Sequence, residues 1–321
     1  MRKPTIILPY SGPDPSGLVE DIFLYLRPES NGVQVESILM KVLRNKAEYR
    51  ENAELVYLAN LPGDFIIQNH VIEDHYSVNY RFACRGKSLF TPFMKERFET
   101  HFQENFDQAL ILGAFEALEY LGMNPEELFT IWVPPQEMIQ INDQSIKKYK
   151  NMYIINYDIP ALLHKNNYST DIAVMILRTS LDRITFQEMI REMEKALIEK
   201  KVMDKEKPPS RYFHYSKGPF GQILDGLGYL YTADGKHLSV ENLSFAKMML
   251  DSGYTMKEIH GAINNPIMHF LDGNELVEDN LFIRTGSLSF HEALDVLKSA
   301  RCQIYLNIKR PGLSKTRCEL T

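Results

Sequence analysis

The sequence predicts an α+β, or mixed α/β, fold made of two subdomains. Between residues 55 and 90, segments rich in β-branched and aromatic residues alternate with turn residues, as in an antiparallel β-meander. From 91 to 121, apolar residues recur every three to four positions, as on a long helix. From 126 onward, strand-like and helix-like segments alternate, which is typical of strand–turn–helix units.

The composition is that of an ordinary globular chain. Its 321 residues are 44% hydrophobic and 24% charged, enough for one large domain or two ordinary ones. The formal net charge of −6 argues against nucleic acid as a general partner. No stretch approaches the roughly 18 apolar residues of a membrane span, and the apolar run before Pro9 is too short for a secretory signal. We therefore expect a soluble, cytoplasmic protein without a membrane segment.

The three cysteines, Cys84, Cys302 and Cys318, are widely spaced. They form no CxxC zinc pattern and fit a reducing compartment. The sequence identifies no cofactor and leaves the oligomeric state open.

The N-terminal subdomain, residues 1–125, begins with a short apolar run and the loop SGPDPSG. Two helical candidates follow, LVEDIFLYL (18–26) and VESILMKVL (35–43), and the second has its apolar residues at helical spacing. The meander (55–90) comes next, and its apolar face is expected to lie under the aromatic stripe of the long helix (91–121).

The stretch NHVIEDHYS, residues 69–77, is predicted to be the tip of a hairpin within the meander. With Glu73 and Asp74 at the turn, nearly all apolar side chains fall on one face, and a slip by one residue would scramble that separation. His70 and His75 then lie together on the polar face. The expected apolar face carries Val71, Tyr76, Val78 and Tyr80.

The C-terminal subdomain, residues 126–310, is predicted to mix both element types, with a surface linker near 203–210 and a mobile tail at 311–321. Two of its helices carry capping-box patterns. The predicted strands are 130–133, 152–157, 171–179, 281–285 and 302–308; the predicted helices are 143–150, 185–201, 241–250, 255–263 and 289–300; an Asp-Gly hairpin is expected at 229–240.

The histidine pair is the first candidate site. HVIEDH matches neither HExxH nor HxxEH, the zinc-binding helix patterns. On the hairpin's polar face, His70 and His75 could hold a metal if a third ligand came from elsewhere, or could act as a general base and its partner. A solvated hairpin end is the simpler alternative.

The loop SGPDPSG is the second candidate, with Ser11, Asp14 and Ser16 as ligating groups. Its prolines remove backbone donors, and acidic residues follow, which disfavours phosphate. A sugar, an amine or a cation suits it better, and the alternative is a plain connection.

Three cations are candidates for binding an anion. Lys217 precedes a glycine-rich stretch, although such glycines commonly mark simple turns. Arg178 and Arg284 are expected at strand ends just before helix starts, where an anion is electrostatically favoured. Pairing with an acidic side chain is the alternative role for both arginines.

The segment LSFAKMMLDSGYTMKEIHGAIN has the outline of a helix-turn-helix, and GYTMKEI resembles the corresponding phrase of MerR-like regulators. The resemblance covers about twenty residues and implies a DNA-reading second helix. That helix offers Lys257, His260 and Asn264, fewer basic and amide side chains than base readout requires. Two helices joined by a glycine turn explain the pattern without DNA.

These observations favour a small-molecule-binding or regulatory protein with its ligand between the two subdomains. One alternative is an enzyme acting on a small, perhaps phosphorylated, substrate. It would use His70 or His75 as general base and Arg178, Arg284 or Lys217 to hold the anion. A protein-interaction scaffold, which would use the aromatic surfaces and the basic tail, is the second alternative.

Overall fold

The computed structural model combines sheets and helices, which confirms the α+β class. Ser16 and the predicted tail at 311–321 lie outside the described part. The described residues are 2–14, 19–28, 30–165, 167–206 and 209–304.

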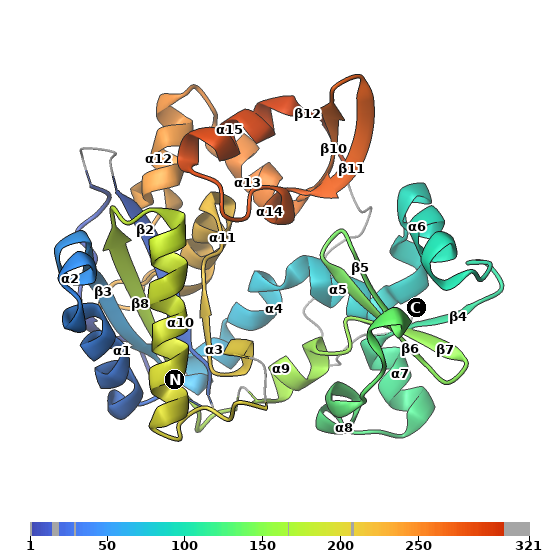
Figure 1. Ribbon diagram of the computed structural model, residues 1–321, viewed down its shortest axis with the longest axis horizontal. Coiled ribbons are helices and arrows are strands. Elements are labelled where there is room, and N and C mark those ends of the chain that lie inside the picture. The colour runs from blue at the N-terminus through green and yellow to red at the C-terminus, as the bar shows by residue number, and fades with distance from the viewer. Residues whose placement is uncertain (1, 15–18, 29, 166, 207–208, 305–321) are drawn as a thin grey trace. The chain divides into compact units, whose positions relative to one another are not determined.

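The chain forms two compact units, and each is assembled from separate stretches (Figure 1). The predicted boundary at 125/126 does not coincide with them, and a division into separately folding domains stays a prediction. Unit 1 comprises Met1–His75, Asn166–Ile263 and Thr285–Asp295, and unit 2 comprises Tyr76–Lys165, Asn264–Arg284 and Val296–Thr321.

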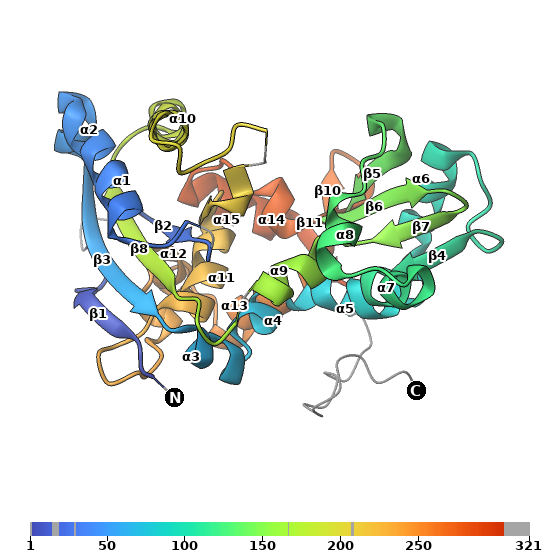
Figure 2. The same ribbon diagram turned by 90° about the horizontal axis from the view of Figure 1, so that it is seen from below.

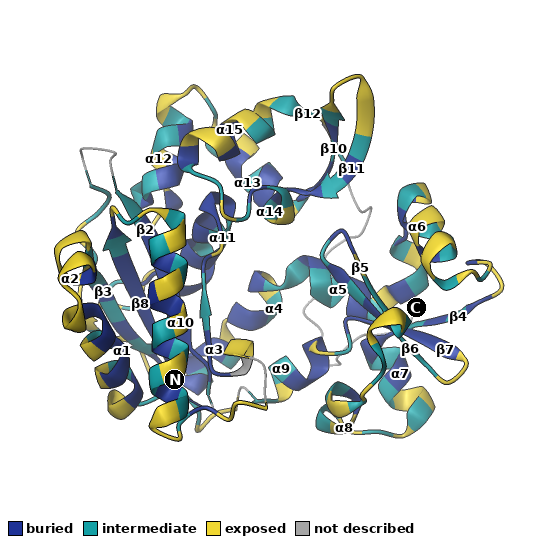
Figure 3. Cartoon of the chain, viewed as in Figure 1, coloured by how far each residue is buried: buried dark blue, intermediate teal, exposed yellow. Residues whose placement is uncertain are grey.

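Unit 1 is built around a five-stranded antiparallel sheet of order β1-β3-β8-β2-β9. Figure 3 shows that the central strands β2 and β8 are buried along most of their length. The strands are β1 (Thr5–Leu8), β2 (Glu20–Leu26), β3 (Ala53–Leu61), β8 (Ile172–Thr179) and β9 (Phe213–Tyr215).

The prediction of a helix at 18–26 is wrong, because this stretch contains strand β2. Its residues 21–26 are all buried, so both faces of the strand carry core side chains. A strand covered on both faces shows a continuous apolar run, which periodicity alone does not distinguish from a buried helix.

Helices cover both faces of the unit 1 sheet (Figure 2). On one face α1 and α10 pack together over a core that includes Leu24, Met175 and Met189. On the other face α11 and α12 contact β2, and α4 packs against α11. The helices are α1 (Val33–Asn45), α2 (Ala47–Asn52), α3 (Gly63–Gln68), α4 (Val71–His75), α10 (Arg183–Glu199), α11 (Pro219–Tyr229), α12 (Ser244–Asp251) and α13 (Met256–Asn264).

The helices predicted at 35–43, 185–201, 241–250 and 255–263 are confirmed as α1, α10, α12 and α13. Helix α10 begins two residues earlier than its predicted cap, because the Asp182 carboxylate accepts hydrogen bonds from the backbone N–H groups of Ile184 and Thr185. The Asp-Gly turn is also present, but its flanks form only an isolated bridge between Tyr231 and His237.

The predicted meander is wrong beyond its first strand. Only β3 forms there, and residues 63–89 make α3, α4, α5 (Ser77–Arg85) and the 3₁₀ turn η1 (Gly86–Leu89). The hairpin at 69–77 is therefore absent: His70 has φ 52 and separates α3 from α4. The apolar residues that fit a strand of period two also fit short helices broken at His70, and burial decides between the two.

Unit 2 contains a four-stranded sheet of order β4-β7-β6-β5, in which only β4 and β7 are parallel, and a three-stranded antiparallel sheet of order β11-β10-β12. The strands are β4 (Leu110–Gly113), β5 (Met138–Ile141), β6 (Gln144–Tyr149), β7 (Met152–Ile155), β10 (Ile267–Asp272), β11 (Glu275–Asn280) and β12 (Ala300–Gln303); the helices are α5, α6 (Pro92–Phe102), α7 (Ala114–Leu121), α8 (Pro125–Thr130), α9 (Ile159–Lys165) and α14 (Leu281–Arg284). The last helix of the described chain is α15 (Phe290–Ser299).

The predicted long helix at 91–121 is also wrong. It divides into α6, strand β4 and α7, because Gln103 adopts a left-handed conformation (φ 53) at the end of α6. Its aromatic stripe still forms a core, in which the ring of Phe98 contacts Phe106 and Tyr153 of β7.

Three smaller predictions in this region fail as well. Residues 143–150 form strand β6 rather than a helix, and 130–133 form no strand. Residues 281–284 form helix α14 rather than a strand. The capped helix at 289–300 and the strands at 152–157 and 171–179 are confirmed by α15, β7 and β8.

Cys84 on α5 takes part in a disulfide bond. The interpretation of the cysteines as typical of a reducing compartment therefore does not hold for this residue. Within the described ranges, no helix is both long and apolar enough to span a bilayer. The cytoplasmic location stays a prediction.

A buried carboxylate joins three segments of unit 2. Glu278 on β11 accepts hydrogen bonds at Oε1 from the Thr91 hydroxyl (2.7 Å) and from Nδ2 of Asn142 (2.6 Å). Asn142 lies in the β5–β6 turn, and its carbonyl accepts from Asn280. Because the side chain of Glu278 is only 3% exposed, these donors replace the water that it loses on burial.

We expect Thr91→Val to lower the free energy of unfolding by about 2–3 kcal/mol, since it deletes a hydrogen bond to a buried carboxylate and the N-cap of α6. Urea denaturation measures this. Thr100→Val, on the exposed side of the same helix, is the control and should change stability by less than about 0.5 kcal/mol. Equal effects of the two changes would contradict the role of Thr91.

Candidate functional site

A concave pocket of about 60 Å³ lies in unit 1. Three segments form it: the end of β9 with the residues that lead into α11, the first turn of α10, and the loop before α15. At roughly 10–15 Å³ for each bound water, the pocket has room for about four to six small atoms. Its lining residues are Arg183, Phe186, Gln187, Tyr215, Ser216, Lys217 and Ser287.

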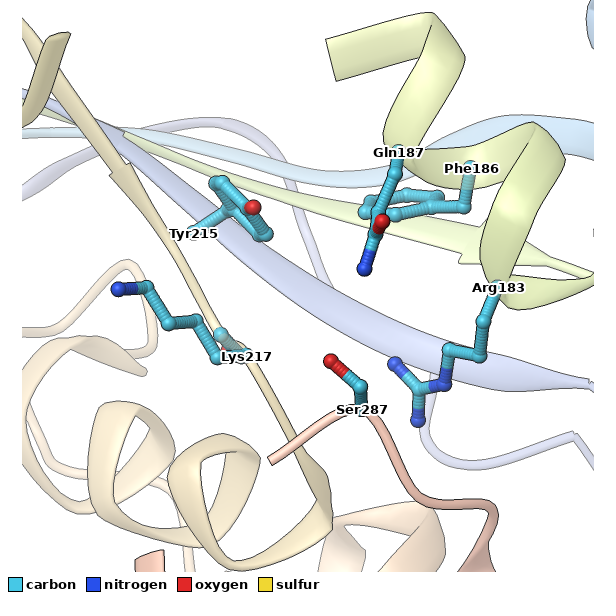
Figure 4. A pocket seen from close by; sticks show the side chains of 7 residues that line it. Arg183, Phe186, Gln187, Tyr215, Lys217 and Ser287 are labelled. Atoms are coloured by element: carbon cyan, nitrogen blue, oxygen red, sulfur yellow. The ribbon is translucent and has the colours of Figure 1, made fainter. Parts of the chain in front are cut away.

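The polar side chains of the pocket converge. Figure 4 shows the guanidinium of Arg183, the hydroxyl of Ser287 and the side-chain amide of Gln187 pointing toward the same space, whereas the amine of Lys217 extends away from it. The rings of Phe186 and Tyr215 lie with their centroids 6.1 Å apart. The pocket therefore combines polar donors with an apolar wall.

The pocket wall requires two unusual backbone arrangements. A Cβ added to Gly218 would lie 2.5 Å from the carbonyl oxygen of Thr285, so only glycine allows the two segments to cross this closely. The backbone N–H of Ser287 donates to the carbonyl of Lys217 (2.7 Å), and Ser287 has φ 68. A non-glycine residue in this region is strained, and such strain clusters at functional sites.

Arg183 is only partly available to a ligand. Its Nη2 lies 2.6 Å from Oε2 of Glu20 and donates to the carbonyl of Leu288 (2.7 Å). Burial raises the pKa of Glu20, and the charge of Arg183 opposes that shift. Arg183 also contributes to the lowered pKa of Glu292, after the hydrogen bonds from Ser289. Two carboxylates thus share the field of this guanidinium.

Lys217 is exposed at the rim. In the described part of the chain its amine makes no ion pair. Of the predicted anion-binding residues, Lys217 is the one that the pocket contains.

Arg178 forms a buried ion pair instead. Its Nε and Nη2 bind the Asp21 carboxylate at 2.7 and 2.9 Å, and this hydrogen-bonded pairing raises the pKa of Arg178. The hydroxyls of Tyr10 (2.6 Å) and Ser244 (3.0 Å) donate to the same carboxylate. Arg178 therefore has the alternative role named above, which is pairing with an acidic side chain.

The N-terminal loop is tied to that pair. The carbonyl of Gly12 accepts a hydrogen bond from Nη2 of Arg178 (2.7 Å), and Asp14 contributes to raising the pKa of Arg178. Ser11 is exposed, and Ser16 lies outside the described residues. The described part of the loop therefore shows an anchoring role, and its ligand stays a prediction.

Arg284 belongs to unit 2, at the end of α14. It pairs with Asp272 and lies 3.7 Å from Asp279, and it also lies over the ring of Phe270. Its pKa is raised, first by the hydrogen bond to Asp272. Arg284 is therefore paired with acidic side chains of β10 and β11.

The two predicted catalytic histidines occupy different surroundings. The side chain of His70 is 45% exposed, and its Nδ1 lies 3.8 Å from Glu73. His75 is buried; its Nε2 lies 3.5 Å from Asp225, and its ring contacts Tyr25 and Tyr229. Their expected position on one polar face is therefore wrong, because α4 turns them apart. Within the described chain, no group of three His, Cys, Asp or Glu side chains could hold a metal ion.

Burial sets the ionisation of the cluster around His75. Burial lowers the pKa of His75 to about 3, and the charge of Arg27 adds to this shift. Burial raises the pKa of Asp225 to about 7, against the hydrogen bond from Ser216 (2.5 Å) and the charge of Arg27. The pKa of His214, whose ring stacks on Tyr25, is also lowered by burial. Burial therefore favours the uncharged form of all three side chains.

Sequence reasoning missed Arg183, Gln187 and Ser287. The available signal was the start of α10, since Arg183 directly follows a good N-cap residue, Asp182. Ser287 carries no such signal, because its conformation depends on the crossing at Gly218.

No family model, curated protein or solved structure matches the chain.

We expect Arg178→Met to lower the free energy of unfolding by about 3–5 kcal/mol, because it leaves Asp21 buried without its counter-charge. Adding Asp21→Asn should recover part of the loss, since asparagine is neutral and still accepts from Tyr10 and Ser244. Lys247→Met, at an exposed helix pair, is the control and should cost less than about 0.5 kcal/mol. A double variant no more stable than Arg178→Met alone would contradict this account.

The raised pKa of Asp225 should make the stability of the protein depend on pH. The folded state holds the Asp225 proton more tightly than the unfolded state between pH 4 and pH 7, so its contribution to stability is present at low pH and is lost as pH rises through about 7. Asp225→Asn has no carboxyl group and does not undergo this loss. The free energy of unfolding of the variant minus that of wild type should therefore be about 3 kcal/mol more favourable at pH 8 than at pH 5. Thermal unfolding at both pH values measures the gain. Asp251→Asn, at an exposed site, should show the same difference from wild type at both; a flat response of Asp225→Asn would sink the assignment.

Proposed function

We propose that the protein binds a small anionic molecule in the unit 1 pocket. The observation that carries the proposal is the convergence of Arg183, Gln187 and Ser287 on one concave space, with Lys217 at its rim. Guanidinium, amide and hydroxyl groups are donors, and donors with fixed directions suit the oxygen atoms of an anion.

The proposal keeps the expected class, a small-molecule-binding or regulatory protein, and places the ligand within one unit. The strained backbone at Ser287 and the close crossing at Gly218 support a built site. The size of the pocket supports a ligand, or one end of a ligand, no larger than about six atoms.

Binding is better supported than catalysis. A general base at neutral pH needs a pKa near 7, whereas the pKa of His75 is lowered to about 3. His75 is also buried beside Asp225 rather than among the residues that line the pocket.

Isothermal titration calorimetry with acetate, propionate and inorganic phosphate tests the proposal. Wild-type protein should bind at least one of them. Arg183→Gln should weaken binding at least about tenfold, because a hydrogen bond to a charged group contributes about 1.5–3 kcal/mol. Lys217→Gln should weaken binding by less, about threefold, because its exposed amine at the rim acts through its charge.

Lys195→Gln, on the exposed face of α10, is the matched control and should leave binding unchanged. Thermal unfolding of each variant separates a lost contact from a lost fold. Binding that is equally strong in all three variants, or the absence of binding by every anion, would overturn the proposal.

A further inference from the structure

The charged side chains around the unit 1 pocket restrict the charge of the ligand that it can bind. This inference rests on the proposed function, because it concerns the same pocket. Four ionisable groups define the local charge: Arg183 and Lys217 are cationic, and Glu20 and Glu292 are acidic. With both acids ionised, these charges sum to zero.

Glu20 competes directly with a ligand for Arg183. The carboxylate is 23% exposed and holds Nη2 of the guanidinium at 2.6 Å. Burial penalises its charge and raises its pKa, and the charge and hydrogen bond of Arg183 oppose that shift. A ligand therefore meets an arginine whose Nη2 already contacts Glu20 and the carbonyl of Leu288. Of the two cations, Lys217 is the one that makes no ion pair in the described part of the chain.

Gln222 is a second polar neighbour of the Glu20 carboxylate. Its side chain interacts with Glu20 and contributes to lowering the pKa of that carboxyl. Yet Nε2 of Gln222 is buried and makes no hydrogen bond of normal length to the described residues. The contact that is established for Glu20 is therefore its ion pair with Arg183.

We propose that the pocket selects a short-chain monocarboxylate over inorganic phosphate, and that Glu20 is the residue that determines this selectivity. A carboxylate adds one negative charge to a site whose four charges sum to zero, and the remaining donors of Arg183 can hydrogen-bond it. A phosphate dianion brings two charges beside Glu20, and uncompensated like charges at close range are unfavourable. The apolar wall of Phe186 and Tyr215 suits a chain of two or three carbons, which matches the room for about four to six atoms.

Competitive NMR titration with propionate and inorganic phosphate at pH 7.5 tests the selectivity in the wild-type protein. Propionate should bind at least about tenfold more tightly than phosphate, a difference of about 1.4 kcal/mol. Equal or tighter binding of phosphate overturns the inference and leaves the proposed function standing. If neither anion binds, both are overturned.

Glu20→Gln tests the assigned residue. Glutamine keeps the shape and removes the charge, so Arg183 should gain affinity for a dianion and the preference for propionate should shrink about tenfold or reverse. A merely structural role for Glu20 would weaken both ligands alike. Glu199→Gln, on the exposed end of α10, is the control and should keep the wild-type preference; an unchanged preference in Glu20→Gln overturns the assignment.

Discussion

The ion pair between Asp21 and Arg178 is the interaction on which the arrangement of unit 1 depends. The two residues face each other in the antiparallel register of β2 and β8, at the centre of the sheet. Burial of both charges is costly, and the bidentate geometry with two added hydroxyl donors offsets that cost. A slip by one residue would place Arg178 on the other face, so the pair also fixes the register. Because β8 leads into α10, that register sets where Arg183 begins the helix.

The sequence predicted elements whose signals are local. The capped helix before 300 and the apolar strand at 171–179 depend on neighbouring residues alone, and both are confirmed. The predictions for residues 63–85 and 91–121 were wrong because the apolar residues there fit both a helix and a strand, and tertiary packing determines which of the two forms. The breaks fall at His70 and Gln103, both in a left-handed conformation that non-glycine residues rarely signal. The class of fold was therefore predictable, and the order of its elements only in part.

The candidate site was predictable to a smaller degree. Lys217 was found because a lysine beside glycines is visible in the sequence. Arg183, Gln187 and Ser287 were missed because they come from segments that only the folded sheet brings together. For Arg178 and Arg284 the sequence left two roles open, anion binding and pairing with an acidic side chain. In the structure they pair with Asp21 and Asp272. Neither aspartate could be assigned as a partner from the sequence, because each is distant along the chain.

The edge strand β9 connects the pocket with the buried cluster on the other side of the sheet. Successive residues of a strand point to opposite faces, so Tyr215 packs toward the core of α10 while His214 stacks on Tyr25 and Ser216 donates to Asp225. In the described part of the chain β9 pairs only with β2, so these side-chain contacts on both faces of the sheet hold the strand that supplies one wall of the pocket.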